Sequence, residues 1–309
     1  MFSLEVPDLV RQRALSGGDP GRRWLNDLPQ VLEQLAHRWR LQIGSVFTGG
    51  SAALVIGVVE DTGRTGVLKV AIPPEIDIAG AFDCSVRAHQ LANGQGCAEL
   101  YAHDAAVPAM LLERLGPNLH QLDLGLEATL GAIVSALQDL WRPLDESCGL
   151  PTGADKALWL AEFITATWDQ LGRPCESAVI ERAITYCDER GSAFEPSTAV
   201  LVHGDAHGWN IVAAGPGRYK LVDAEGLWSE PAHDLAVPMR EYNAPLLDGN
   251  TRRLVRDRAE LLAGWCGLDP EAVWQWGYIE RVSTGLTNLR DFDNPDNGRL
   301  FLEVATRSL

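Results

Sequence analysis

The chain has 309 residues, of which 46% are hydrophobic and 22% charged, and it contains ten tryptophans. That composition is sufficient to bury a substantial core, in one large domain or in two coupled lobes. The 26 basic and 42 acidic residues leave a formal net charge of −16. This charge argues against a nucleic acid as partner, because binding to a phosphate backbone depends on lysine and arginine.

Nothing in the sequence points to a membrane or to export. No apolar run approaches the length of a membrane span, and residues 1–13 lack the basic-then-apolar plan of a signal peptide. The six cysteines have no Cys-x-x-Cys or metal-ligand spacing, so we expect reduced, mostly buried thiols. We therefore expect a cytoplasmic protein without a membrane partner. Its negative charge fits either plain solubility or the attraction of a cationic substrate.

The N-terminal part of the chain predicts a helix followed by a sheet. Residues 21–40 carry apolar side chains at the spacing of an amphipathic helix. Strands are predicted at 41–47, 53–60, 65–70, 97–103 and 109–113, with a helix at 76–93. The first three strands follow one another directly, which is typical of an antiparallel sheet and argues against a doubly wound dinucleotide-binding fold.

The remainder of the chain is mainly helical in pattern. Predicted helices span residues 126–142, 154–171, 177–190, 232–243, 250–266 and 270–290. The change from strands to helices near residue 115 marks a boundary between lobes. We predict an α+β fold with two lobes, an N-terminal one of residues 1–115 with a leading helix and a larger helical one of residues 116–309.

Residues 199–226 hold the polar side chains that indicate chemistry. Short strands are predicted at 199–202, 211–213 and 219–222, and the turn Gly215-Pro216-Gly217 reverses the chain between the last two. This hairpin is expected to bring Asp223 beside Asn210 and Asp205. Phosphoryl transfer needs such a set, in which one aspartate accepts the hydroxyl proton while an asparagine and a second aspartate offer oxygens to Mg²⁺. The alternative is a polar turn without chemistry.

At these residues the sequence resembles a known family. His203-Gly204-Asp205-x-x-x-x-Asn210 followed by Asp223 resembles the catalytic loop and metal aspartate of aminoglycoside phosphotransferases and other small-molecule kinases of the protein-kinase-like fold. Asp223-Ala-Glu225-Gly226 and the later Pro231-Ala-His-Asp234 are similar to the streptomycin 6-kinase and hydroxyurea phosphotransferase branch. The resemblance covers most of the chain and implies a two-lobed, ATP-dependent kinase with a nucleotide-binding N-terminal lobe and an acceptor site in the C-terminal lobe.

The resemblance implies a phosphate site in the N-terminal lobe. Lys69, on the predicted third strand, would hold the α and β phosphates. Its partner on the following helix would be Asp83, with Glu75 as the alternative; the family usually has glutamate there. Without the resemblance, the usual interpretation of Lys69 would be a surface lysine on an edge strand.

Two further segments of this lobe are implied to touch the nucleotide. The small residues Gly49, Gly50 and Ser51 form a loop between the first two strands, where backbone N–H groups can approach phosphates. The segment around Glu113 and Leu115 resembles the family's hinge between the lobes. Adenine would bond to its backbone; ATP is the expected nucleotide, and GTP is not excluded.

In the C-terminal lobe the resemblance assigns a role to each residue of the motif. Asp205 would orient and deprotonate the acceptor hydroxyl, with His203 holding the loop rather than acting as the base itself. Asn210 and Asp223 would bind Mg²⁺. Asp234 would brace the catalytic loop, although it also reads as a simple carboxylate at a helix start. Glu225 is placed to reach magnesium through water or to face the acceptor.

The acceptor is predicted from charge and aromatic content. Carboxylates at Glu225, Glu241 and Glu280, with flat side chains at Trp228, Tyr242 and Trp274, suit a small, cationic, hydroxylated molecule. We expect a resistance kinase for an aminoglycoside-type antibiotic, acting as a monomer or homodimer. The alternatives are a kinase for a metabolic sugar, amino sugar or similar compound, and a nucleotide-binding module without turnover.

Overall fold

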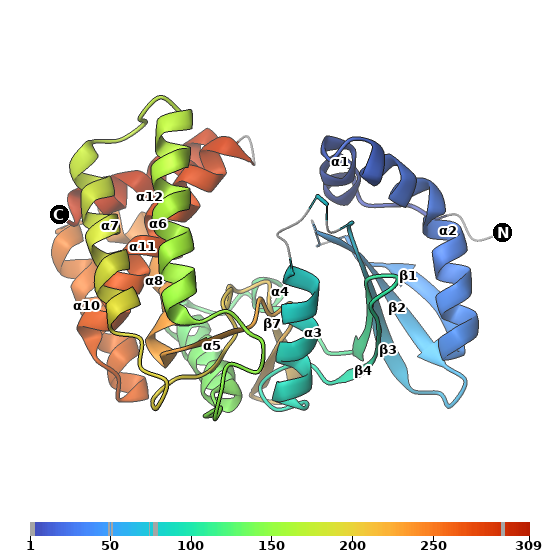
Figure 1. Ribbon diagram of the computed structural model, residues 1–309. Helices are drawn as coiled ribbons and strands as arrows, with labels where there is room; N and C mark the ends of the chain where they lie inside the picture. The colour runs from blue at the N-terminus through green and yellow to red at the C-terminus, as the bar shows by residue number, and fades with distance from the viewer. Residues whose placement is uncertain (1–3, 49, 51, 74, 77–79, 292–293) are drawn as a thin grey trace. The chain divides into compact units, whose positions relative to one another are not determined.

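The computed structural model describes residues 4–48, 50, 52–73, 75–76, 80–291 and 294–309. The chain forms two compact units, Met1–Gly116 and Pro117–Leu309 (Figure 1). Of the predicted phosphate-loop residues, Gly50 is described, while positions 49 and 51 lie outside the described residues. The predicted α+β class with two lobes is confirmed by a strand-rich first unit and a helical second unit.

The first unit is a five-stranded antiparallel sheet with the strand order β1-β2-β3-β5-β4. Its elements, in chain order, are α1 (Asp8–Ser16), α2 (Asp19–Trp39), β1 (Leu41–Val46), β2 (Ala53–Glu60), β3 (Thr65–Ala71), α3 (Ala81–Ala92), β4 (Leu100–Asp104) and β5 (Ala109–Glu113). The β2–β3 and β3–β5 ladders place Lys69 opposite Val55 and Met110, in the centre of the sheet. Lys69 therefore lies on a central strand, not on an edge.

One face of this sheet packs against α2. The buried Leu28, Leu32 and Leu35 of α2 join Ile56 and Leu68 of the strands in a single hydrophobic cluster. Because side chains alternate along a strand, burial of Leu68 and Val70 turns Lys69 to the other face of the sheet. The apolar pattern of β3 alone therefore predicts the face of the sheet on which the Lys69 side chain lies.

The structure of the first unit differs from the prediction at two helices. The helix predicted at 76–93 begins only at Ala81, after Gly80, whose φ of +80° is not helical. Helix α1 was not predicted. It crosses α2 so closely that a Cβ atom at Gly21 would lie 1.7 Å from the Ala14 carbonyl oxygen, so only glycine permits this packing.

The second unit carries helices around two small two-stranded sheets. Its helices are α4 (Leu119–Leu122), α5 (Leu126–Leu140), α6 (Gly153–Gln170), α7 (Ser177–Ser192), α8 (Ala236–Arg240), α9 (Ala244–Leu247), α10 (Thr251–Cys266), α11 (Pro270–Arg290), α12 (Pro295–Arg307) and the 3₁₀ turn η1 (Pro231–His233). Strands β6 (Val200–Val202) and β9 (Leu227–Ser229) pair with each other, as do β7 (Ile211–Gly215) and β8 (Arg218–Leu221).

Helix α11 forms the centre of this unit. It is buried on every side along most of its length, as expected of a helix surrounded by others, and it lies amid α6, α7, α8, α10 and α12 (Figure 1). At Gly277 an added Cβ would lie 2.6 Å from Met239 Cβ, so α8 approaches α11 closely. Among the helices that the structure describes, none combines the length and apolar composition of a membrane span.

The predicted helix at 232–243 is wrong as a single element. The structure divides it into η1 and the short α8, and α8 ends because Glu241 is extended and Tyr242 has a φ of +55°. Helices α4, α9 and α12 and strand β9 were not predicted. The break after α8 matters for the site, because it turns Glu241 and Tyr242 away from the helix axis.

Candidate active site

The loop that follows β6 is held from below by one buried carboxylate. Asp234, which follows η1 and is fully buried, accepts hydrogen bonds from the backbone N–H groups of His203 (2.9 Å) and Gly204 (2.8 Å). It also accepts one from the indole N–H of Trp141 at 2.9 Å. Burial raises the pKa of Asp234, against the opposing pull of His203 and these donors. The carboxylate thus fixes the start of the loop.

The buried His203 ties the loop to the strand on its other side. Its Nε2–H donates to the Val222 carbonyl oxygen at 2.9 Å, while Nδ1 accepts the backbone N–H of Asp205 at 3.2 Å. Burial lowers the pKa of His203, which favours the neutral ring that these two bonds require. Both ring nitrogens are occupied, so His203 has a structural part in this geometry.

Asp205 presents its carboxylate between two cationic side chains. Oδ1 accepts a hydrogen bond from Arg240 Nη2 at 2.9 Å, and Oδ2 lies 3.3 Å from His207 Nε2. Burial alone would raise the pKa of Asp205, but His207 and Arg240 outweigh it and hold that pKa below its ordinary value. The same attraction raises the pKa of His207, again against burial. Asp205 is therefore ionised near neutral pH and remains 30% exposed.

The β7–β8 hairpin brings the second half of the motif to this loop, as expected. Asn210 accepts the backbone N–H of Val222 at 2.9 Å, which places Asp223 one residue further along. The amide Nδ2 of Asn210 donates to the Asp205 carbonyl oxygen at 3.0 Å and leaves its Oδ1 for another partner. Asp223 is exposed and has a φ of +64°, a conformation that is uncommon outside glycine and concentrates at functional sites.

These residues suit a hard cation. Asn210 Oδ1 and the Asp223 carboxylate are oxygen donors of the kind that Mg²⁺ prefers, and Mg²⁺ is usually held by one or two protein oxygens together with substrate phosphates. Within the described part of the chain, no group of three or more His, Cys, Asp and Glu side chains could hold a metal ion.

Glu225 is paired with a residue that sequence reasoning missed. Lys156 Nζ, in the first turn of α6, lies 2.9 Å from Glu225 Oε2. Burial lowers the pKa of Lys156, but Glu225 and other carboxylates outweigh it and raise that pKa. A capping box between Thr152 and Asp155 starts α6 just before Lys156 and thereby directs the lysine toward the loop after β8.

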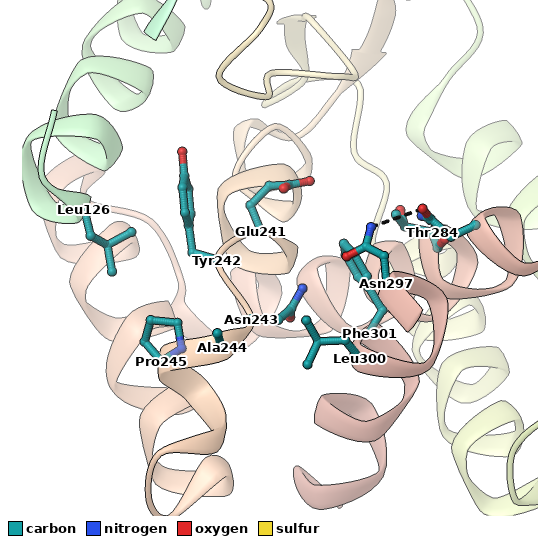
Figure 2. Close-up of a pocket in the computed structure, with 11 residues that line it drawn as sticks. Leu126, Glu241, Tyr242, Asn243, Ala244, Pro245, Thr284, Asn297, Leu300 and Phe301 are labelled. Atoms are coloured by element: carbon teal, nitrogen blue, oxygen red, sulfur yellow. Dashed lines mark hydrogen bonds between the residues drawn. The ribbon is translucent and has the colours of Figure 1, made fainter. Parts of the chain in front are cut away.

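A pocket of about 450 Å³ adjoins the loop after β6 in the second unit (Figure 2). It is lined by Leu126, Glu241, Tyr242, Asn243, Ala244, Pro245, Thr284, Asn288, Asn297, Leu300 and Phe301. Two of the residues that line the pocket lie near this loop. Glu241 Oε1 lies 3.5 Å from Arg240 Nε, and Arg240 in turn bonds to Asp205 of the loop. A Cβ atom added at Gly208 would lie 3.6 Å from the Tyr242 hydroxyl oxygen. Figure 2 shows Leu126 and Pro245 on one side of the pocket and Asn297 and Phe301, which belong to α12, on the other.

Three residues predicted to meet the acceptor are instead parts of the core. Trp274 is 2% exposed and donates its indole N–H to the Tyr186 hydroxyl at 3.0 Å. Trp228 is 7% exposed and packs edge-on against Phe194. Glu280 is buried and bonds to Arg240. Of the predicted acceptor residues, Glu241 and Tyr242 are the two that line the pocket.

In the first unit the predicted nucleotide residues Lys69, Asp83 and Glu113 lie on β3, on α3 and at the end of β5. Lys69 is half-buried on β3, and Asp83 is exposed in the first turn of α3; their pairing stays a prediction, as does that of Lys69 with Glu75. At the end of β5, Glu113 donates its backbone N–H to the Glu99 carbonyl oxygen (2.8 Å) and accepts the Glu99 N–H on its carboxylate (3.1 Å).

Comparison with known proteins decides the family. The model of the aminoglycoside/hydroxyurea antibiotic resistance kinase family matches residues 38–291, which is most of the chain. The chain belongs to this family. It is therefore a kinase that transfers a phosphoryl group to a hydroxyl group of a small molecule, and the resemblance seen in the sequence is confirmed.

Relatives of this kinase cover nearly its whole length. A streptomycin 6-kinase from Streptomyces glaucescens is 27% identical over 292 residues, which are 93% of this chain and 92% of the relative. A hydroxyurea phosphotransferase from Kitasatospora aureofaciens is 28% identical over 302 residues, which are 93% of this chain and 81% of the relative.

Solved structures share the fold of the kinase at low sequence identity. A thermostable mutant of aminoglycoside phosphotransferase APH(4)-Ia, in ternary complex with AMP-PNP and hygromycin B, has a TM-score of 0.62 at 15% identity and covers 90% of this chain and 98% of its own. The choline kinase LicA from Streptococcus pneumoniae has a TM-score of 0.59 at 10% identity and covers 92% of this chain and 98% of its own.

Replacing Asp234 with alanine is expected to destabilise the kinase by ~2 kcal/mol or more. The change leaves two backbone N–H groups and an indole N–H buried without an acceptor, and each unmade bond costs ~1–3 kcal/mol. Urea unfolding of the variant measures the loss. Trp141→Phe is the matched control, since it removes only one donor and should cost less. Equal stability of Asp234→Ala and the parent protein would contradict the bracing role.

Proposed function

We propose that this kinase uses Mg²⁺ and ATP to phosphorylate a hydroxyl group of an aminoglycoside-type antibiotic. The observation that carries the proposal is the ionised, partly exposed carboxylate of Asp205 beside a pocket that contains the acidic Glu241. The likeness to streptomycin 6-kinases along nearly the whole chain supports the same acceptor class.

Asp205 acts on the acceptor in this proposal. Its Oδ2 accepts the hydrogen bond of the acceptor hydroxyl and aims that oxygen at the γ-phosphorus. The new oxygen–phosphorus bond forms as the bond to the bridging oxygen breaks, ADP leaves, and the hydroxyl proton passes to Asp205. His203 and Asp234 hold the loop that carries the aspartate.

Asn210 and Asp223 are the proposed magnesium residues, because their oxygens fit the cation and adjoin Asp205 through the β7–β8 hairpin. The metal supplies neutralisation of charge on the phosphate oxygens. Glu225 is already engaged by Lys156, which favours an indirect part through water over direct ligation.

The first unit is proposed to bind the nucleotide. Lys69, central in the sheet, holds phosphates, with Asp83 as its proposed partner, and the loop around Gly50 covers them. The backbone at Glu113 and Leu115 receives the base. Because the base is bound by backbone groups, GTP is the second nucleotide to be tested.

The pocket with Glu241 and Tyr242 is the proposed acceptor site. Its volume of about 450 Å³ falls within the ~300–1,000 Å³ typical of sites for drug-sized ligands. Such a volume suits a multi-ring acceptor better than hydroxyurea, the second candidate, which the 28% identical relative brings into consideration. Glu241 offers a carboxylate to an ammonium or guanidinium group, and Asn243 and Asn297 offer polar groups to hydroxyls.

A nucleotide-consumption screen tests the proposal. Streptomycin, hygromycin B, neutral and amino sugars, and hydroxyurea are each supplied with Mg-ATP and with Mg-GTP. The proposal expects the largest kcat/KM for an aminoglycoside. Consumption with hydroxyurea alone would favour the second candidate, and a neutral sugar as best acceptor would favour a metabolic kinase.

Replacing Glu241 with glutamine is expected to raise the acceptor KM by ~10-fold and to leave the nucleotide KM unchanged. A charge-assisted hydrogen bond contributes ~1.5 kcal/mol or more, and 1.4 kcal/mol is tenfold in affinity. The parent acceptor KM should also rise with added salt, since charges are screened over ~8–10 Å at physiological ionic strength. Glu260→Gln, at an exposed position on α10, is the control. An unchanged acceptor KM in Glu241→Gln would remove this residue from the acceptor site.

A further inference from the structure

Arg240 joins Asp205 to a buried carboxylate on the central helix. It is the last residue of α8, and its side chain is 12% exposed. One guanidinium nitrogen, Nη2, donates to Asp205 Oδ1 at 2.9 Å, and the other, Nη1, donates to Glu280 Oε2 at 2.7 Å. Glu280 lies on α11 and has a side-chain exposure of 6%. A planar guanidinium spans two carboxylates in this way, which a lysine ammonium does with less directional control.

The backbone that carries Arg240 is fixed by the packing of α8 on α11. Gly277 lets Met239 approach α11 closely, as the 2.6 Å distance between its Cβ and an added Cβ at Gly277 indicates. Arg281 donates to the carbonyl oxygens of Met239 and Arg240. The end of α8 is thus bound to α11 at the level of Glu280, so the direction of the Arg240 side chain is determined before any substrate is present.

The two oxygens of Asp205 are held differently. Oδ1 has the short bond to Arg240, while Oδ2 has a longer contact of 3.3 Å with His207, whose side chain is more exposed than that of Arg240. An incoming hydroxyl can therefore share or replace the contact at Oδ2 without breaking the bond at Oδ1. This asymmetry leaves one defined oxygen for the acceptor.

We propose that Arg240, aimed by Glu280, is a positioning residue for phosphoryl transfer: it holds Oδ1 of Asp205 so that Oδ2 meets the acceptor hydroxyl. The proposal rests on the function of Asp205 proposed above. Arg240 acts through the aspartate and need not touch either substrate. Its permanent charge also favours the ionised carboxylate, since an arginine does not lose its proton at any working pH.

A purely structural ion pair is the alternative, and a change in kcat distinguishes the two. In Arg240→Gln we expect kcat to fall by ~10²-fold, because a misplacement of about 1 Å at a reacting group can cost that much. The KM for Mg-ATP should stay unchanged. Arg240→Lys should keep the charge but lose the geometry that lets one side chain donate to both Asp205 and Glu280. It should therefore recover only part of the rate. Glu280→Gln should give a smaller loss, since Asp205 keeps its cation.

The pH profile gives a readout that stability does not affect. Removing Arg240 raises the pKa of Asp205 toward its ordinary value, so the acid limb of kcat/KM moves to higher pH in Arg240→Gln and stays in place in Arg240→Lys. The titratable and charged groups that act on the Asp205–Arg240 pair are His203, His207, Lys156, Glu225, Glu241, Glu280 and Arg281. All seven are retained in Arg240→Gln and Arg240→Lys.

Histidine NMR provides a readout without any acceptor. The nearby Arg240 charge opposes protonation of His207, so Arg240→Gln should raise the pKa of that ring. If the single variants do not fold, Arg240→Gln combined with Glu280→Gln removes both buried charges together and should still show the loss in kcat. The control pair is Arg190→Gln with Glu230→Gln, a partly buried ion pair in the same unit, which should change thermal stability but not the pH profile.

The outcomes separate this proposal from the function of Asp205. If Asp205→Ala abolishes turnover while folded Arg240→Gln has the parent kcat and acid limb, the positioning role is overturned and the aspartate's role stands. If Asp205→Ala itself retains turnover, the proposed function fails first. A loss in Arg240→Gln that equals the loss in the control pair would identify a structural ion pair only.

Discussion

Replacing Asp205 with alanine is expected to lower kcat by ~10²–10⁴-fold while nucleotide affinity survives. Proton acceptance by a positioned base is worth this factor, and losing the orientation of the hydroxyl adds to it. The nucleotide does not depend on this carboxylate, because the bonds of Asp205 run to Arg240 and His207 within the second unit. Asp205→Asn should behave similarly, since its amide accepts no proton.

Steady-state kinetics with the best acceptor, together with calorimetric titration of Mg-ATP, measure the two quantities separately. Asp139→Asn, at an exposed position on α5, serves as the control for loss of one negative charge. Turnover of Asp205→Ala within threefold of the parent would contradict the assignment.

The same carboxylate affects stability in a pH-dependent way. The cations His207 and Arg240 outweigh burial and depress the pKa of Asp205 in the folded state, so the ionised form stabilises the fold. This contribution is fully present above the unfolded pKa of ~3.9 and disappears as the pH falls through the folded value. Asp205→Asn should therefore be less stable than the parent at pH 7 and approach it in strongly acidic solution.

Replacing Asp223 with asparagine is expected to weaken Mg-nucleotide binding by ~10–100-fold or more and to reduce kcat as well. Even residues that only support a metal ligand cost this much when changed. The substitution keeps an oxygen and the size of the side chain but removes its charge. Asparagine also tolerates the φ of +64°, so the backbone should not change. Asn210→Ala should follow the same direction, and Lys69→Ala should raise the nucleotide KM more than the acceptor KM.

Asp123→Asn is a matched control, because Asp123 has a φ of +47° at the end of α4 and is not among the proposed metal residues. Calorimetry with Mg-ATP should show parent affinity for it and weak binding for Asp223→Asn. Unchanged Mg-ATP affinity in Asp223→Asn, Asn210→Ala and Lys69→Ala together would mean that the nucleotide site lies elsewhere.

The arrangement of residues 203–223 was predictable because its information is local. His203, Asp205 and Asn210 stand within eight positions, and a glycine-containing turn returns the chain to Asp223. Hydrogen bonds within the segment, such as those of His203 to Val222 and Asp205, then follow from the order of residues. The antiparallel sheet of the first unit was predictable for the same reason, since its first strands are adjacent in the chain.

Arg240 and Lys156 were not found because their partners are distant in sequence. Arg240 meets Asp205 across 35 positions and Glu280 across 40, and Lys156 meets Glu225 across 69. Each arginine or lysine on a helix has the same local appearance whether it is solvated or paired. Only the packing of α8 on α11 and the start of α6 at its capping box select these two.

For the aromatic residues the error was a wrong assignment to the site rather than an omission. Trp228 and Trp274 were predicted at the acceptor because tryptophan suits ring faces, yet the strand pairing of β9 and the central position of α11 bury both. Tyr242 was predicted on the same grounds and does line the pocket, since α8 ends just before it. The residue type alone therefore did not distinguish aromatic side chains of the core from those that line the pocket. The position of Tyr242 just after the end of α8 did.

Identification of the phosphorylated product tests the central claim most directly. The purified kinase is incubated with Mg-ATP and streptomycin, and the acceptor is analysed by mass spectrometry and ³¹P NMR. The account predicts an acceptor that carries one phosphoryl group on a hydroxyl oxygen, formed together with ADP, and formed ~10²–10⁴-fold more slowly by Asp205→Ala. Nucleotide consumption that leaves every tested acceptor unmodified, or product formation that persists undiminished in Asp205→Ala, would contradict it.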